Sequence, residues 1–96
     1  MYLNEIIKDK REKILEIAKN HGAQAVRVFG SVVRGQSTAS SDIDFLITLK
    51  SGSTLLDIVA IKQDLEEFLG CKVDVVTEKS LSPYIRESVL KEAVNL

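Results

Sequence analysis

Asp42 and Asp44 are separated by one residue and lie at the start of an apolar segment. Ten residues separate Asp42 from a preceding Gly30-Ser31 pair. Side chains at positions i and i+2 of a strand point to the same face, so the two carboxylates are expected to lie side by side. Neighbouring carboxylates repel each other, and a hard divalent cation such as Mg²⁺ relieves that repulsion. The pair could therefore hold a metal ion, although a solvated strand edge with two acids would look the same.

Gly30 and Ser31 follow a short apolar run and could approach a phosphate group. Glycine lets the backbone come close to a phosphate, N–H groups at a helix start can bind it, and the Ser31 hydroxyl adds one more donor. Arg34 lies one turn further on, where its guanidinium could reach phosphate oxygens. Taken alone, however, a Gly-Ser pair is also what an ordinary turn contains.

The spacing of Gly30 and Gly35 matches the glycines of a Walker-type phosphate loop. That motif requires Lys and then Ser or Thr directly after the second glycine. Gln36 and Ser37 stand there instead. Because the lysine is missing and the chain is short for such an enzyme, we exclude a P-loop NTPase.

A third acid, Asp74, lies within the apolar segment 72–77. A carboxylate in such a segment is costly to bury unless it has a partner. If this segment forms a strand beside the strand of Asp42 and Asp44, all three carboxylates could share one face. They could then hold two cations and orient a hydroxyl for phosphoryl transfer. The alternative is an acid on an exposed edge strand.

The periodicity of apolar residues predicts the elements that would position these side chains. Thr54 and Asp57 have the spacing of a capping box, and Ser82 before Pro83 is a typical helix start. We expect helices over 3–20, 55–69 and from 83 onward, strands over 25–29, 43–49 and 72–77, and a loop over 30–41 that contains a short helical turn at 32–34. Three strands with helices give an α/β or α+β layered domain.

Composition limits the function classes. The 96 residues suit one domain, 1–96, and 13 basic residues against 14 acidic ones give a net charge of −1. Stand-alone nucleic-acid binding usually needs a clear basic excess, so we expect none that is strong. The sequence contains no apolar run long enough to span a membrane. A cytoplasmic location is expected.

The combination of these motifs resembles the DNA polymerase β-like nucleotidyltransferase superfamily, over about residues 25–77. The resemblance implies a nucleotidyltransferase fold with a small three-stranded mixed sheet and flanking helices. It also implies roles for seven residues. The catalytic and metal-binding positions would be Asp42, Asp44 and Asp74, and the nucleotide-binding positions would be Gly30, Ser31, Arg34 and Ser41.

The chain lacks the extra domains with which larger superfamily members hold their acceptors, so it resembles the minimal nucleotidyltransferase (MNT) group. Members of that group are often antitoxins paired with a HEPN-domain ribonuclease toxin. The resemblance implies a hetero-oligomer in which AMP passes from ATP to a tyrosine of the toxin, with two Mg²⁺ ions. Two alternatives stay open: a nucleotidyltransferase for a small molecule or RNA, and a non-catalytic antitoxin that blocks its partner by binding.

Overall fold

A mixed four-stranded sheet forms the centre of the protein, whose computed structural model describes residues 7–35 and 42–96. The strands are β1 (Ala23–Phe29), β2 (Ile43–Leu49), β3 (Val73–Val76) and β4 (Val94–Asn95), in the order β3-β2-β1-β4. β1 is antiparallel to both of its neighbours, and β2 is parallel to β3. The predicted mixed sheet with flanking helices is confirmed, with one strand more than expected.

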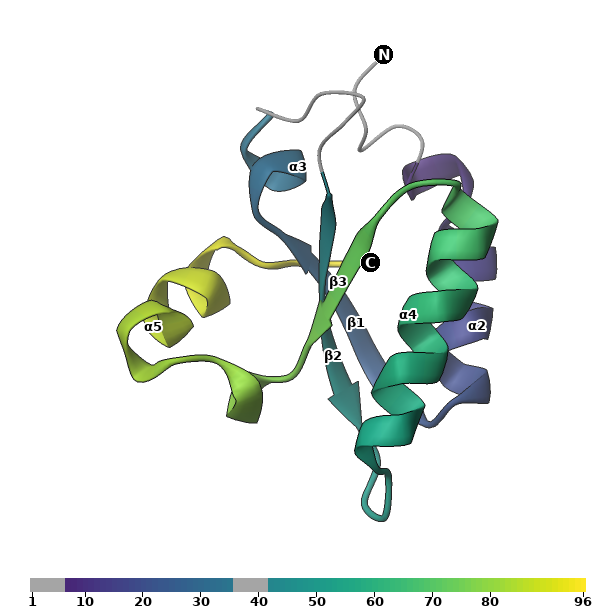
Figure 1. The fold of residues 1–96 in the computed structure, drawn as a ribbon. Coiled ribbons are helices and arrows are strands. Elements are labelled where there is room, and N and C mark those ends of the chain that lie inside the picture. The colour runs from purple at the N-terminus through teal and green to yellow at the C-terminus, as the bar shows by residue number, and fades with distance from the viewer. Residues whose placement is uncertain (1–6, 36–41) are drawn as a thin grey trace.

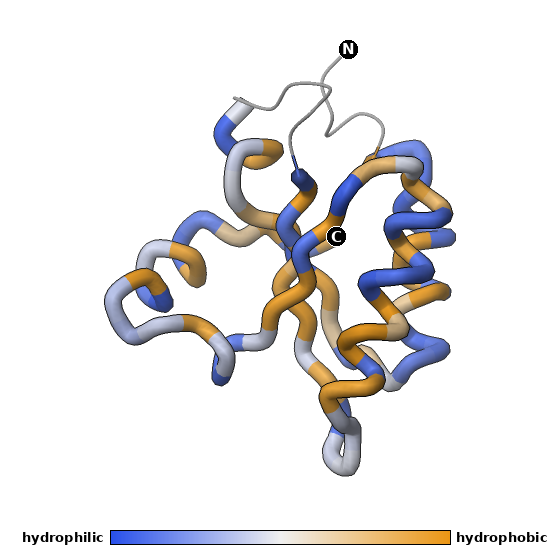
Figure 2. The backbone as a smooth tube through the Cα atoms, viewed as in Figure 1, coloured by the Kyte–Doolittle hydropathy of each residue, from blue (hydrophilic) through white to orange (hydrophobic). Residues whose placement is uncertain are grey.

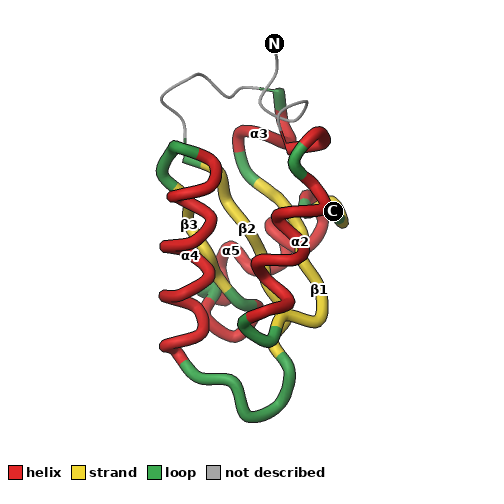
Figure 3. Tube along the Cα trace, turned by 90° about the vertical axis from the view of Figure 1, so that its right-hand side faces the viewer, coloured by secondary structure: helices red, strands yellow, loops and turns green. Residues whose placement is uncertain are grey.

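Helices cover the two faces of this sheet unequally. α2 (Arg11–Asn20) and α4 (Leu55–Leu69) lie side by side on one face, whereas α5 (Pro83–Glu92) lies on the other (Figures 1 and 3). The short α3 (Ser31–Arg34) follows β1, and the 3₁₀ turn η1 (Glu78–Ser80) leads from β3 to α5. Within the part of the chain that the structure describes, no helix is long and apolar enough to cross a membrane.

Both helix starts that the sequence predicts are confirmed. The Thr54 hydroxyl oxygen accepts a hydrogen bond from the first turn of α4, and Asp57 Oδ2 accepts one from the Thr54 N–H at 2.8 Å, which completes the capping box. α4 ends at Gly70. Ser82 caps α5 with its hydroxyl oxygen, and Pro83 occupies the first helical turn, where a missing N–H costs nothing.

The first and the last predicted helix differ in extent from the expectation. Residues 7–9 are helical, but Lys10 is a turn whose N–H donates to Ile7 C=O at 3.2 Å, so the predicted helix over 3–20 is not one continuous element. Its residues 3–6 lie outside the described part. At the other end, α5 stops at Glu92 and the chain turns into β4, which pairs with β1. Two residues are too few for a strand periodicity to be visible.

Two hydrophobic clusters hold the layers together, one on each face of the sheet. Ile43, Phe45 and Ile47 alternate along β2 and pack into the larger cluster, under α2 and α4. Leu46 points the other way, into a smaller cluster with Leu81 and Val89 beneath α5. Figure 2 shows the strands as largely apolar. Asp44 alternates with Ile43 and Phe45, so it belongs to the face of Leu46.

Phe45 anchors the strand that carries Asp44, because its ring is fully buried in the larger cluster. We expect Phe45→Ala to lower the free energy of unfolding by about 3–5 kcal/mol, through lost burial and a cavity. Urea denaturation followed by circular dichroism measures the loss. The control is Leu55→Ala, whose side chain is 77% exposed and which should change stability by less than about 0.5 kcal/mol. Equal losses of unfolding free energy in both variants would contradict the role of Phe45 as the anchor of this strand.

Candidate functional site

The sheet topology brings the end of β1 and the starts of β2 and β3 to one end of the molecule. An antiparallel partner places the last residues of β1 beside the first of β2, and parallel pairing places the first residues of β2 and β3 together. α3 lies at the same end (Figure 1). Gly30, Asp44 and Asp74 therefore meet there, although they come from three separate parts of the sequence.

The strand register fixes the two aspartates as direct neighbours. Asp44 on β2 is paired with Asp74 on β3 and, on its other side, with Phe29 on β1. The condition that the sequence analysis set for Asp74, a strand beside that of Asp44, is therefore met. Leu46 and Val76, the next residues on the same face, belong to the cluster beneath α5. The acids thus occupy the α5 face of the sheet.

Asp42 precedes β2 by one residue, is exposed, and lies near enough for its charge to act on Asp44. Asp74 is exposed and Asp44 is half-buried. The structure therefore pairs two of the three acids that the sequence singles out, Asp44 and Asp74, and the charge of the third, Asp42, also acts on Asp44. Ser41, which the resemblance also indicates, lies outside the described residues.

The absence of a side chain at Gly30 leaves space for the carboxylate of Asp44. Gly30 is buried and has φ +81°, a backbone conformation that L side chains rarely adopt. A Cβ at this position would overlap Oδ2 of Asp44. The carboxylate therefore packs directly on the backbone between β1 and α3. Ser31, the first residue of α3, is half-buried beside it.

Asp44 has a pKa raised from 3.8 to about 6. Burial is the main cause, followed by repulsion from Asp74 and Asp42 and by a hydrogen bond with the Asp74 side chain; Arg34 acts in the opposite direction. Each of these causes except Arg34 penalises a negative charge on Asp44 in the folded protein. A cation bound between the carboxylates would reverse that penalty.

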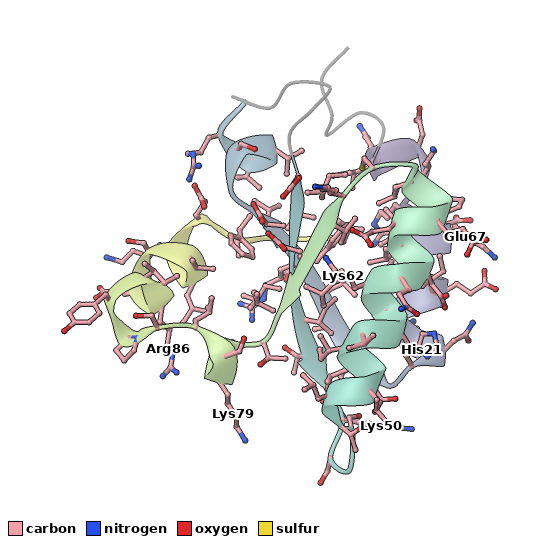
Figure 4. All side chains as sticks on the ribbon, in the orientation of Figure 1. His21, Lys50, Lys62, Glu67, Lys79 and Arg86 are labelled. Atoms are coloured by element: carbon pink, nitrogen blue, oxygen red, sulfur yellow. The ribbon has the colours of Figure 1, made fainter. Side chains whose placement is uncertain are left out.

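Two α4 side chains that the sequence analysis did not single out hold the start of β3. Lys62 Nζ donates to Val73 C=O at 2.8 Å, and Glu66 Oε2 accepts from Val73 N–H at 3.1 Å. Figure 4 shows Lys62 extending from α4 at the level of β3. These bonds tie β3 to α4 one residue before Asp74. No local pattern predicts them, because the partners lie on different elements.

A further acid reaches the site from α5. Glu92 accepts a hydrogen bond from Gly30 N–H at 2.9 Å through Oε2, and its Oε1 lies 2.7 Å from Arg34 Nη1. The sequence analysis missed this residue, because nothing in the pattern at the end of α5 points to Gly30. Arg34 thus has a carboxylate partner at the position where the sequence led us to expect a phosphate.

The donor set suits a hard cation. Within residues 7–35 and 42–96, no three His, Cys, Asp or Glu side chains form a ready-made metal cluster. Mg²⁺ does not need one, since one or two carboxylates with water and substrate phosphates usually complete its octahedron. The hydrogen-bonded pair of Asp44 and Asp74, with Asp42 nearby, provides such carboxylates. The residues therefore fit Mg²⁺ delivered together with a phosphorylated substrate.

The contact between Gly30 and Asp44 can be tested with a matched pair of glycines. Gly30→Ala should destabilise the protein by at least about 1 kcal/mol more than Gly52→Ala. Both variants are strained by a positive φ, but only Gly30→Ala also displaces the Asp44 side chain. Gly52 has φ +91° and nothing within 4 Å of an added Cβ. Urea denaturation of both variants gives the difference. Equal losses would mean that the Asp44 carboxylate does not need this space.

The raised pKa of Asp44 predicts an unusual pH dependence. The folded state holds the Asp44 proton up to about pH 6, whereas the unfolded chain releases it near pH 4. The stabilisation is therefore complete below pH 4 and is lost as the pH rises to 6. We expect the Asp44→Asn variant to lack this decrease in stability between about pH 4 and pH 6. It should also be more stable than the native protein at pH 7.5 without divalent cations. Thermal unfolding at several pH values checks it. A parallel fall in both proteins would contradict it.

Comparison with known sequences identifies a family and relatives for this chain. The chain matches the nucleotidyltransferase domain family over residues 8–96. It is 41% identical over 96 residues to a candidate protein adenylyltransferase of Methanocaldococcus jannaschii, covering 100% of this chain and 99% of the relative. It is also 37% identical over 79 residues to the protein adenylyltransferase MntA of Thermococcus cleftensis, covering 82% and 80% of the two chains.

Solved structures share the fold. A candidate minimal nucleotidyltransferase superposes with a TM-score of 0.85 at 47% identity, over 96% of this chain and 94% of that one. A toxin–antitoxin crystal structure with AMP-PNP superposes with a TM-score of 0.75 at 23% identity, over 88% and 69% of the chains, and indicates the fold alone. The chain belongs to the nucleotidyltransferase domain family and is a nucleotidyltransferase of the minimal group.

Proposed function

We propose that this protein transfers AMP from ATP to a tyrosine hydroxyl of a HEPN-type ribonuclease toxin and thereby acts as its antitoxin. The observation that carries the proposal is the pairing of Asp44 with Asp74 in the strand register, against the backbone of Gly30. This arrangement supports the proposal, because two carboxylates suited to a metal ion lie beside a backbone that a phosphate could approach. The relatives named as protein adenylyltransferases support AMP as the group that is transferred and a protein as the acceptor.

In this proposal, each site residue has a separate task. Asp42 and Asp44 hold Mg²⁺, and Asp74 helps to hold a second ion. When bound, these ions neutralise the charge of the triphosphate. The backbone of Gly30 and the hydroxyl of Ser31 bind the β- and γ-phosphates, with Arg34 beside them. Ser41 is the remaining nucleotide-binding position, given by the family resemblance.

The reaction needs a proton acceptor and an aligned nucleophile. Asp74 accepts the proton of the incoming tyrosine hydroxyl, and the freed oxygen attacks the α-phosphorus of ATP. A new bond forms between that oxygen and phosphorus as the bond to the bridging oxygen breaks, and pyrophosphate leaves. Fixing the triphosphate in line with the acceptor supplies much of the acceleration, together with charge neutralisation.

The open α5 face of the sheet favours an acceptor from another chain. Asp42 and Asp74 are exposed there, and α5 covers this face only through a small apolar cluster. A protein partner could therefore present a hydroxyl directly to the acids in a hetero-oligomer. The net charge of −1 gives no general attraction for RNA. We place the reaction in the cytoplasm, where ATP and a ribonuclease target are both available.

The proposal is tested by mixing the protein with ATP, Mg²⁺ and an active HEPN-type toxin encoded beside it. Mass spectrometry should find AMP on a toxin tyrosine, with pyrophosphate released in equal amount. The double variant Asp42→Asn, Asp44→Asn should lower the rate at least about 100-fold, because the phosphate charge is no longer neutralised. Chelating the divalent cation should have the same effect.

The control variant is Asp64→Asn, which removes an aspartate that pairs with His21 at 2.7 Å on the other side of the sheet. Its rate should equal that of the native protein. Absence of AMP on an active toxin would overturn the proposal. Toxin neutralisation that survives in the Asp42, Asp44 double variant would instead indicate inhibition by binding. AMP transfer to RNA or a small molecule, with none to the toxin, would indicate a different acceptor.

A further inference from the structure

Glu92 binds two groups that the proposed function assigns to the triphosphate, the Gly30 N–H and the Arg34 guanidinium. It is the last residue of α5, and its side chain is 21% exposed. One carboxylate oxygen accepts from Gly30 N–H at 2.9 Å, and the other lies 2.7 Å from Arg34 Nη1. A backbone N–H and a guanidinium converging on two oxygens of one anion is the arrangement that a phosphate group would use.

The Gly30 N–H cannot serve a carboxylate and a phosphate at once. Each is an acceptor-only anion, and the Gly30 N–H is a single donor. The two anions would also repel each other at hydrogen-bonding distance, in a place where Asp44 already has a raised pKa because of burial and of repulsion from Asp74 and Asp42. Glu92 must therefore leave Gly30 before a phosphate can take its place.

The structure allows Glu92 to leave without disturbing the core. The helix that carries it is exposed over residues 82–88 and is anchored to the sheet through Val89, with Leu90 and Ala93 packed at the edge of the same small cluster. Rotation of one side chain at the end of such a helix disturbs no buried core residue. The cost of release is then the loss of the two contacts to Gly30 and Arg34.

We propose that Glu92 is an internal competitor for the phosphate-binding position, and that it sets the nucleotide affinity of this enzyme. The inference rests on the proposed function for its ligand, a nucleoside triphosphate. Only molecules in which Glu92 has withdrawn can bind the triphosphate, so the apparent affinity is reduced by the fraction of molecules in that state. Removing the competitor should strengthen binding.

Isothermal titration calorimetry with Mg²⁺ and α,β-methylene-ATP tests this, because that analogue cannot transfer AMP. Three variants are compared with the native chain. Glu92→Gln removes the charge, whereas Glu92→Asp keeps the charge but is too short to hold both contacts. Glu87→Gln removes a carboxylate from the exposed face of the same helix, where Glu87 pairs with Lys91 at 3.1 Å.

We expect both Glu92 variants to bind the analogue roughly fivefold more tightly than the native protein, and Glu87→Gln to bind as the native protein does. Circular dichroism confirms that each variant is folded. Unchanged or weaker binding in both Glu92 variants would overturn the inference and would make Glu92 a residue that positions Arg34. Tighter binding by Glu92→Gln alone would also overturn it, because Glu92→Asp, which cannot hold both contacts, would then have failed to relieve the competition.

Failure of the proposed function would look different. In that case, neither the native protein nor any variant would bind the analogue, and inorganic tripolyphosphate would give no heat either. That result overturns both proposals together. Native binding without the expected gain in the Glu92 variants overturns only the internal competitor. Inorganic tripolyphosphate should show the same order of affinities as the nucleotide, because Glu92 contacts the phosphate position and not that of the base.

Discussion

The repulsion between Asp44 and Asp74 is the constraint on which the rest of the site depends. Backbone pairing between β2 and β3 fixes the two residues opposite each other, whatever their charges prefer. The apolar residues on the opposite face, among them Ile43 and Phe45, supply the burial that keeps the strands together. The folded chain thus carries an unfavourable charge arrangement, which a bound cation would relieve. Such local conflict between stability and charge is typical of functional sites.

The two faces of the sheet have different tasks: one carries the hydrophobic core, and the other carries the acids of the candidate site. One face is closed by α2 and α4 over a large apolar cluster, and the bonds from Lys62 and Glu66 hold β3 from that side. The acids lie on the other face, where coverage is incomplete. The proposed transfer from a nucleotide to a second macromolecule would need this kind of access.

The sequence predicted the parts of the site that have a local signature. Acids inside an apolar segment are rare enough to stand out, so Asp44 and Asp74 could be identified. Contacts between distant residues had no such signature. The bond between Gly30 and Glu92 joins positions 62 residues apart, and β4 is a two-residue strand held only by its pairing with β1. Tertiary contacts decided both, and no periodicity reports them.

The parallel pairing of β2 and β3 also determines when the site can exist. Antiparallel neighbours such as β1 and β2 can form early from a single reversal of the chain, whereas a parallel neighbour requires the whole crossover through α4 to close first. Asp44 therefore meets Asp74 only after α4 has docked on the sheet. A nascent or partly folded chain holds the glycine and the first two acids without the third. The metal affinity that the proposed function requires would consequently be a property of the completed fold, and its appearance during refolding would mark the closing of the α4 crossover.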